Sequence, residues 1–462
     1  MRHFSVWGKQ KGRVGGWARR RARFRNCYHA SPPAISQTCT APAGRPRRPG
    51  RRRGACLPRF PGRGGRPARG AIPVLAAGSA LSHFAAPASL AARSPRPGTA
   101  SPAVVRMSSP APPVTRVLGP RPRILIVRLS ALGDVVHGLP VACALRDAFG
   151  DAEIGWVVEG RNAELLAGHP AIDHVIGVQR RWLKSARAVL DLRRRLRALQ
   201  FEIAVDLQCL TKSAVVAYLS GARRRLGVAG RDGRELSKLF HNELTPVRAN
   251  HVVDHYLGIL APLGITQPRV RFDLPETQDD GAFAERLIAA EELPRRGYAV
   301  LNPGAGWPSK LWPAERYGQL AQRLREEHGL VSLAVWGPAS ERLLAEQIVA
   351  ASGGAARLAP ATTVMQLAAV TRRARLFVGS DTGPMHLSVA VDTPTVSLHG
   401  ASRAEWCGAY GAANARVQAY YQAGPARQRR SADNAAMRAI SVDDVADACG
   451  GVLARTAQAA SA

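Results

Sequence analysis

The sequence predicts an α/β protein made of two doubly wound domains, each built on a parallel sheet, behind a basic N-terminal segment that has no core of its own. Three observations lead to this prediction. Short apolar runs alternate with helical periodicity from residue 122 onward, one polar connector interrupts that alternation, and positive charge is concentrated at the N-terminus.

The first 106 residues hold 22 of the 65 Lys and Arg residues and none of the 33 Asp and Glu residues, so most of the net charge of +32 belongs to them. Their runs rich in Arg, Pro and Gly, such as 44–54, show no apolar period and cannot offset the entropy of ordering the chain. We therefore expect residues 1–121 to be disordered.

Four interpretations of this basic segment stay open. It binds RNA, it is an Arg-rich transit peptide, or it is a signal peptide whose apolar core is Ala71–Ala92, a stretch that His83 and Pro87 interrupt. In the fourth interpretation Met107 is the true start and the upstream residues are an overextended reading frame.

Outside this segment the charge is ordinary, so the high pI alone does not make the whole protein a nucleic-acid binder. An apolar share of 46% allows two cores, and no apolar run reaches the ~20 residues of a membrane span, which argues against an integral membrane protein. The cysteines have no CxxC or metal-ligand spacing and are expected to be reduced thiols of a cytosolic protein. They are Cys27, Cys39, Cys56, Cys143, Cys209, Cys407 and Cys449.

The first domain is expected over residues 122–275. A buried strand at Ile124–Val127 leads through a turn, 128–134, into a helix whose apolar positions recur at helical spacing up to Phe149. Further strands are predicted at Ile154–Val158, His174–Val178 and Ile203–Asp206, with an amphipathic helix over Lys184–Leu199.

The second domain is expected over residues 281–440, after the polar connector Asp273–Asp280. Its predicted strands are Tyr298–Asn302, Val331–Trp336, Leu376–Gly379 and Thr395–Leu398. A helix with the apolar stripe Tyr317, Leu320, Ala321 and Leu324 ends at Gly329, and Ser441 with Asp444 caps a last helix over residues 441–455.

In such folds the ligand crevice lies outside the carboxyl ends of the strands. Asp134 follows the first strand and either caps the next helix or acts as a general base that takes the proton of an acceptor hydroxyl. Lys310 follows Tyr298–Asn302 in a loop whose glycines let backbone amides approach an anion, and its ammonium suits phosphate.

The segment Leu376–Leu387 is the most specific. Thr382 and Gly383 open a helix whose free amides and dipole would hold a diphosphate without a metal. Asp381 would repel phosphate unless it is neutralised or turned inward, and the inward role is favoured. His386 is either a packing residue or a phosphate contact, and Glu341 either binds a ribose or favours the start of its helix.

Several familiar sites are absent from the sequence. It has no P-loop, no GxGxxG after the first strand, no His/Cys cluster with metal-ligand spacing and no Asp-x-Asp pair to hold a divalent cation. Hydride transfer by a dinucleotide fold and ATP hydrolysis both lose support.

Four segments together resemble the ADP-heptose:lipopolysaccharide heptosyltransferases, glycosyltransferase family 9. They are 123–137, 302–313, 336–341 and 379–387, and their order holds over about residues 122–455. The resemblance implies a GT-B fold, in which two Rossmann-like domains face a central cleft and the C-terminal helix, 441–455, crosses back to the first domain.

The resemblance also implies an activity: transfer of L-glycero-D-manno-heptose from ADP-heptose to Kdo of lipid A, with inversion and with no metal or cofactor. Asp134 would deprotonate the acceptor hydroxyl and Lys310 would balance charge on the departing ADP. The donor would be held by Ala305, Gly306, Glu341, Asp381, Thr382, Gly383 and His386. One departure is Gly304–Trp307, where hydroxyl side chains are more usual in the heptosyltransferase I branch that the chain resembles most, so contact there must come from backbone.

The same resemblance assigns the acceptor side to residues of the first domain, namely His137, Arg180, Arg181, Lys184, Gln208 and Lys212. The basic ones would meet the anionic groups of Kdo-lipid A; otherwise they are a solvated surface. The implied location is cytoplasmic, peripheral on the cytoplasmic face of the inner membrane, with no specific nucleic-acid partner.

Two alternatives are kept. The first is a family 9 enzyme with a different nucleotide-sugar donor or acceptor. The second is a nucleic-acid-binding protein that acts through its Arg-rich arm.

Overall fold

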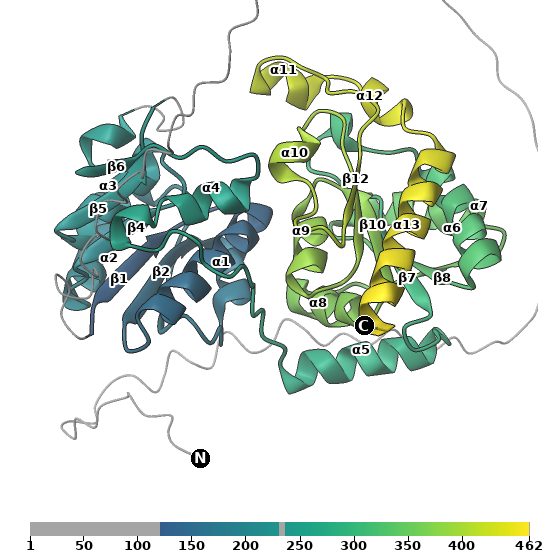
Figure 1. The fold of residues 1–462 in the computed structure, drawn as a ribbon, viewed down its shortest axis with the longest axis horizontal. Coiled ribbons are helices and arrows are strands. Elements are labelled where there is room, and N and C mark those ends of the chain that lie inside the picture. Colours follow the sequence, from purple (N-terminus) through teal and green to yellow (C-terminus); the bar gives the residue numbers. More distant parts are fainter. Residues whose placement is uncertain (1–120, 231–235, 462) are drawn as a thin grey trace, which may run out of the picture. The chain divides into compact units, whose positions relative to one another are not determined.

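A computed structural model describes residues 121–230 and 236–461, all of which belong to one compact unit, Ala103–Ala462. This unit contains two six-stranded sheets, each flanked by helices (Figure 1). All the strand pairings are parallel, which confirms the prediction of two doubly wound α/β domains. The interpretations of residues 1–120 concern a segment outside the described residues.

The first lobe is built on the sheet β3-β2-β1-β4-β5-β6. Its strands are β1 (Arg123–Val127), β2 (Glu153–Glu159), β3 (His174–Val178), β4 (Ile203–Asp206), β5 (Arg224–Val228) and β6 (Glu243–Thr245). Its helices are α1 (Leu132–Ala148), α2 (Ala186–Ala198), α3 (Thr211–Ser220) and α4 (Val252–Gly258). Ile124 and Ile126 share one core with α1 and α4, whereas Leu125 and Val127 share another with α2 and α3. This burial on both faces explains the uninterrupted apolar run of β1.

The second lobe repeats the arrangement with the sheet β12-β11-β10-β7-β8-β9. Its strands are β7 (Tyr298–Asn302), β8 (Val331–Ala334), β9 (Ala356–Leu358), β10 (Leu376–Ser380), β11 (Thr395–Leu398) and β12 (Ala415–Val417). Its longer helices are α5 (Gln278–Ala290), α6 (Ala314–His328), α7 (Ala339–Ala351), α8 (Val364–Arg372), α9 (Gly383–Ala390) and α13 (Val442–Ser461). Shorter helices are α10 (Ala404–Cys407), α11 (Ala426–Ser431) and α12 (Ala435–Arg438), and the 3-10 helices of the two lobes are η2 (Gly160–Leu166), η3 (Trp182–Lys184), η4 (Ser237–Leu239), η5 (Ala261–Leu263) and η6 (Pro308–Lys310).

Most local predictions hold, and the exceptions have local causes. Helix α2 begins at Ala186, because the Ser185 hydroxyl accepts a hydrogen bond from the Ala188 amide at 3.3 Å and caps the helix there. Gly329 ends α6 with a left-handed φ of +68°. Four strands were not predicted: β5, which opens with two arginines and shows no apolar run, and β6, β9 and β12, whose three residues are too few to show a period.

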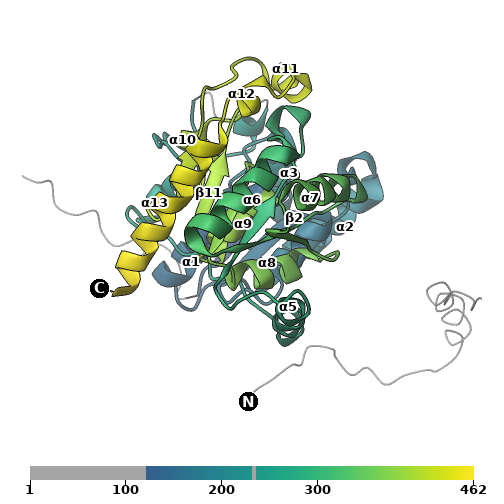
Figure 2. The same ribbon diagram turned by 90° about the vertical axis from the view of Figure 1, so that its right-hand side faces the viewer.

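The C-terminal helix is a correction. It was expected to cross back to the first domain over residues 441–455, but α13 packs on α6, β11 and β12 of its own lobe and continues to Ser461 (Figure 2). Val445, Cys449 and Val452 are buried in the same core as Tyr317 of α6. This apolar stripe covers the β11 side of the sheet face that α6 and α7 also cover, and its burial there holds the helix on the second lobe.

The strand order of each lobe reverses at one point, between β1 and β4 in the first and between β7 and β10 in the second. Ligands of doubly wound sheets bind outside the carboxyl ends of the strands at such points. The helices that follow β1 and β10, α1 and α9, pack against each other. The two switch points therefore open toward a shared region.

Candidate active site

Two cavities lie at the carboxyl ends of the strands. One of about 610 Å³ is lined by both lobes, with Asp134 and His137 from the first and Lys310, Asp381 and His386 from the second. A smaller one of about 300 Å³ lies next to it in the second lobe and is lined by Ala305 and Glu341. Gly306, Thr382 and Gly383 line both cavities. We call them the central cavity and the donor cavity.

Asp134 lies in the first turn of α1, where its carboxylate accepts a hydrogen bond from the Ala131 amide at 3.0 Å. The same oxygen is 2.5 Å from Nη2 of Arg128, a buried arginine stacked over the Tyr256 ring. The Asp134 side chain still keeps 40% of its surface exposed. It therefore caps its own helix and also presents a carboxylate to the central cavity, so both sequence interpretations are compatible with its position.

Lys310 ends η6, and its ammonium is held on three sides. It lies 2.6 Å from Oδ2 of Asp381, 3.1 Å from the Asp381 carbonyl oxygen and 4.3 Å from the centre of the Trp307 ring. Burial alone would raise the pKa of Asp381, but the hydrogen bond from His386 and the charge of Lys310 hold that pKa well below its usual range. Asp381 is thus turned inward and neutralised by Lys310, which removes its repulsion toward a phosphate in the cavity.

A chain of imidazoles extends from Asp381 into the first lobe. His386 Nε2 is 3.0 Å from Asp381 Oδ1, and His386 Nδ1 is 2.9 Å from His137 Nε2. Burial, helped by the neighbouring His386 and His251, keeps the pKa of His137 well below its usual value, so His137 is neutral. Because ionised Asp381 can only accept, His386 donates to it through Nε2, and the two imidazoles link this carboxylate to α1 of the first lobe.

The loops after β7 and β10 meet at the donor cavity. The Asn302 amide group donates to the Gly304 carbonyl and to the Thr382 hydroxyl, both at 3.3 Å, and so ties the loop after β7 to the loop after β10. Helix α9 begins at Gly383, and Thr382 and Gly383 at its N-terminus line this cavity. Glu341 accepts from the Gly337 amide at 3.0 Å, at the start of α7. The arrangement offers amides to an anion and a carboxylate to hydroxyl groups.

Comparison with known proteins identifies the family. Residues 189–436 match the family described as glycosyltransferase family 9 (heptosyltransferase). Lipopolysaccharide heptosyltransferase 1 of Pseudomonas aeruginosa is 33% identical over 313 residues, which are 66% of this chain and 85% of that protein. The chain belongs to glycosyltransferase family 9.

Further relatives agree with this assignment. Lipopolysaccharide heptosyltransferase 1 of Escherichia coli K12 is 29% identical over 298 residues, 63% of this chain and 91% of the relative. The structure of E. coli heptosyltransferase WaaC with ADP-2-deoxy-2-fluoro heptose superposes with a TM-score of 0.53 at 26% identity, covering 70% of this chain and 98% of that one. A family 9 glycosyltransferase of Veillonella parvula, at 20% identity and a TM-score of 0.61, covers 72% of this chain and 97% of its own and supports the fold.

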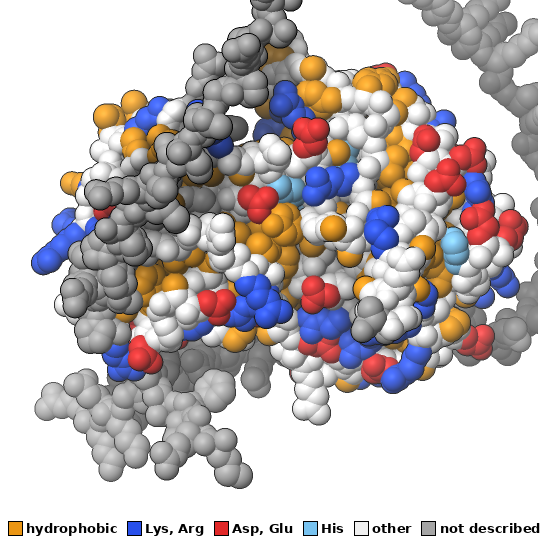
Figure 3. Space-filling view, in the orientation of Figure 1, with side chains coloured by type: hydrophobic (Ala, Val, Ile, Leu, Met, Phe, Trp, Pro, Cys, Tyr) orange, Lys and Arg blue, Asp and Glu red, His pale blue; other side chains and the backbone are white. Residues whose placement is uncertain are grey.

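Of the acceptor residues expected in this glycosyltransferase, His137 lines the central cavity with Asp134, and the other five do not. Arg180 and Arg181 line a separate cavity of about 980 Å³ beside α2, whose lining does not include Lys184. Lys212 forms an ion pair with the buried Glu159, and the Gln208 side chain accepts from the Leu129 amide at 2.9 Å. His137 lines the central cavity, but one of its ring nitrogens is occupied by His386. On the face seen in Figure 3, basic side chains are mixed with acidic and hydrophobic ones.

Further residues at or beside the central cavity of this family 9 enzyme were not predicted. Arg128 holds Asp134, and a wall of the second lobe adds Trp307, Arg403, Tyr421 and Arg429. The Arg403 guanidinium stacks over the Tyr421 ring at 5.1 Å. The carboxyl-end rule applied to β11 would have pointed to Arg403, since the loop after this strand faces the site.

Proposed function

We propose that this enzyme transfers L-glycero-D-manno-heptose from ADP-heptose to Kdo of the lipopolysaccharide inner core, with inversion at the anomeric carbon and without a metal ion or cofactor. The observation that carries the proposal is that Asp134 of one lobe and Lys310 of the other line the same cavity, beside a helix N-terminus suited to a diphosphate. The names of the relatives support the donor and the acceptor class.

On the donor side, the amides of Ala305, Gly306, Thr382 and Gly383 hold the two phosphates of ADP, and Glu341 accepts from the ribose hydroxyls. The loop Gly304–Trp307 has no hydroxyl side chain, so its contribution comes from backbone. His386 and Asp381 fix the ammonium of Lys310 at the phosphate end of the central cavity.

The proposed reaction is a single displacement. Asp134 takes the proton of the acceptor hydroxyl while that oxygen bonds to the anomeric carbon, and the bond from this carbon to the β-phosphate oxygen breaks. The electron pair leaves with ADP, whose developing charge Lys310 balances. Attack from the side opposite to ADP inverts the anomeric carbon. Arg128 keeps the Asp134 carboxylate oriented during the step.

On the acceptor side, Kdo-lipid A brings carboxylates and phosphates while its acyl chains stay in the membrane. Arg403, stacked on Tyr421 at the central cavity, meets the Kdo carboxylate, and Arg180, Arg181, Lys184 and Lys212 form a basic approach to the anionic glycolipid. Among the described residues, no helix combines the length and apolar character needed to cross a bilayer. We propose a cytoplasmic enzyme, peripheral on the cytoplasmic face of the inner membrane, with no specific nucleic-acid partner.

The test is turnover of the full chain with ADP-heptose and Kdo-lipid A, compared with a panel of UDP- and GDP-sugars. We expect product only with ADP-heptose, inverted anomeric configuration by NMR, and undiminished activity in EDTA. Transfer from another nucleotide sugar would favour the alternative donor, and a requirement for a divalent cation would contradict the metal-free mechanism.

A further inference from the structure

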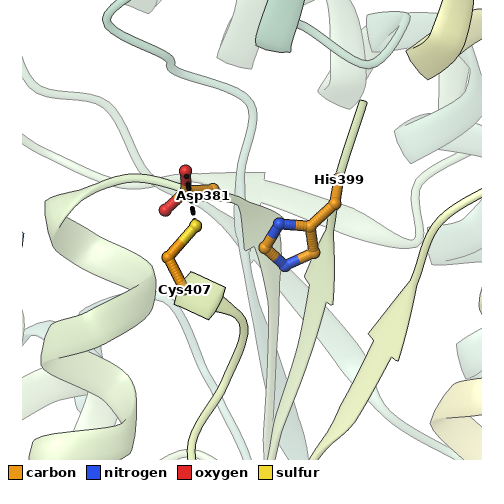
Figure 4. Close-up of side chains that lie close together, drawn as sticks. All are labelled: Asp381, His399 and Cys407. Carbon is orange, nitrogen blue, oxygen red and sulfur yellow. Dashed lines mark hydrogen bonds between the residues drawn. The ribbon is translucent and has the colours of Figure 1, made fainter. Parts of the chain in front are cut away.

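Three side chains of metal-ligand type, from three successive segments of the chain, meet beside the central cavity. Asp381 follows β10, His399 follows β11, and Cys407 ends α10 (Figure 4). One ligand atom of each lies within 4.8 Å of the other two. Cys407 and Asp381 also line the central cavity, which provides a route for an ion from solvent.

The ligand types suit a tetrahedral thiophilic cation, and the three ligand atoms need only draw together from separations of at most 4.8 Å. Ligand atoms bound to Zn²⁺ at about 2.0–2.3 Å lie roughly 3.3–3.8 Å from one another. The Cys407 sulfur is already 3.4 Å from Oδ2 of Asp381. His399 is buried, and its ring nitrogens form hydrogen bonds with the hydroxyls of Ser397 at 3.0 Å and Ser402 at 3.3 Å, so one of these contacts can be exchanged for a metal bond.

The oxygen that would bind the metal is already the partner of a cation. Oδ2 of Asp381 holds the Lys310 ammonium at 2.6 Å. A dication on the same oxygen would repel that ammonium strongly in this buried position, because the interaction of two charges grows as the dielectric falls. Metal binding at Oδ2 therefore competes with the Lys310–Asp381 ion pair.

We propose that Asp381, His399 and Cys407 form an inhibitory site for Zn²⁺ and similar thiophilic divalent cations, whose occupation displaces Lys310 from Asp381. Binding forms the metal–sulfur bond and releases the thiol proton to solvent, with no change of oxidation state. The inhibition rests on the proposed role of Lys310 in phosphate stabilisation, whereas the binding does not.

Binding is tested first on the full chain with Co²⁺, whose bond to a thiolate gives a charge-transfer band in the near ultraviolet. We expect this band in the wild type and its loss in Cys407→Ser, which keeps a hydrogen-bond donor to Asp381. Cys143→Ser is the matched control, because the Cys143 thiol also donates to an aspartate, Asp273, at 3.7 Å but lies outside this cluster. Thermal unfolding of each variant shows that it is folded.

Inhibition is tested with Zn²⁺ in the transferase assay. We expect at least a tenfold loss of activity that EDTA restores, no loss with Mg²⁺, and at least tenfold lower Zn²⁺ sensitivity in Cys407→Ser than in Cys143→Ser. A Co²⁺ band that persists in Cys407→Ser, or the lack of a band in the wild type, would overturn the site. A chain that shows the Cys407-dependent band but no heptosyl transfer would keep the site and overturn the proposed function.

Discussion

The donor side and the acceptor side of this enzyme are built differently. Lys310, Asp381 and His386 form one buried network at the switch point of the second lobe, with each charge paired. Arg180 and Arg181, in contrast, are exposed at the edge of a wide cavity beside α2. The difference suggests that the phosphate end of the donor is held by a rigid, preorganised site, whereas the large anionic acceptor is attracted by a dispersed basic surface.

Substitution of Asp134 should have the largest effect on activity. This residue belongs to the first lobe, but Arg128 fixes its carboxylate, as the ion pairs of the donor side fix Lys310 and Asp381. We expect Asp134→Asn to lower kcat by about 10²–10⁴-fold, because the amide cannot accept the acceptor proton. Steady-state kinetics with saturating Kdo-lipid A measures the change. Asp151→Asn, in an exposed turn after α1, is the control, and near-normal kcat in Asp134→Asn would remove the general base.

Lys310→Met tests whether the buried network of Lys310, Asp381 and His386 supports both catalysis and stability. Loss of the ammonium should lower kcat by about 10²–10³-fold and also destabilise the fold, because Asp381 would then be buried without its cation. Kinetics and thermal unfolding report the two effects. Lys238→Met, an exposed lysine on η4, should change neither. A variant with wild-type stability and rate would show that the network is dispensable.

The pH dependence of stability tests the contact between His137 of the first lobe and His386 of the second. Its folded pKa lies well below the ordinary 6.5, so below about pH 6.5 the unfolded chain takes up a proton that the folded chain refuses. The free energy of unfolding should therefore fall with decreasing pH, by at most about 1.4 kcal/mol per pH unit for this one group. Denaturant unfolding between pH 7.5 and 5 measures the slope.

The slope should be shallower in His137→Asn than in His174→Asn, a half-buried histidine at the start of β3. Equal slopes in the two variants would mean that folding does not lower the pKa of His137.

Substitutions in the dispersed basic surface around Arg180 and Arg181 should have small effects on the kinetics. We expect the double variant Arg180→Ala, Arg181→Ala to raise KM for Kdo-lipid A by about 3–10-fold with kcat nearly unchanged, an effect that shrinks as salt is added. Arg357→Ala, an exposed arginine of β9, is the control. A large loss of kcat would instead place these arginines at the reacting groups.

Much of this molecule could be predicted from local patterns. Two apolar runs, Ile124–Val127 and Tyr298–Asn302, predict strands that are buried on both faces. Gly329 ends its helix because glycine readily adopts the left-handed φ found there. The rule that chemistry lies at the carboxyl ends of strands placed Asp134 and Lys310 correctly at one cavity.

Other features could not be seen along the chain, because each depends on residues that only folding brings together. His137 and His386 are 249 positions apart and share a hydrogen bond, and α13 stays on its own lobe because the apolar stripe of the helix fits an open sheet face there. The cluster of Asp381, His399 and Cys407 arises because three adjoining segments end at one edge. Periodicity in the sequence thus determined the helices and strands, and with them the edge of each sheet at which chemistry occurs. Tertiary packing decided which charges, rings and thiol are paired, because those contacts have no period in the sequence.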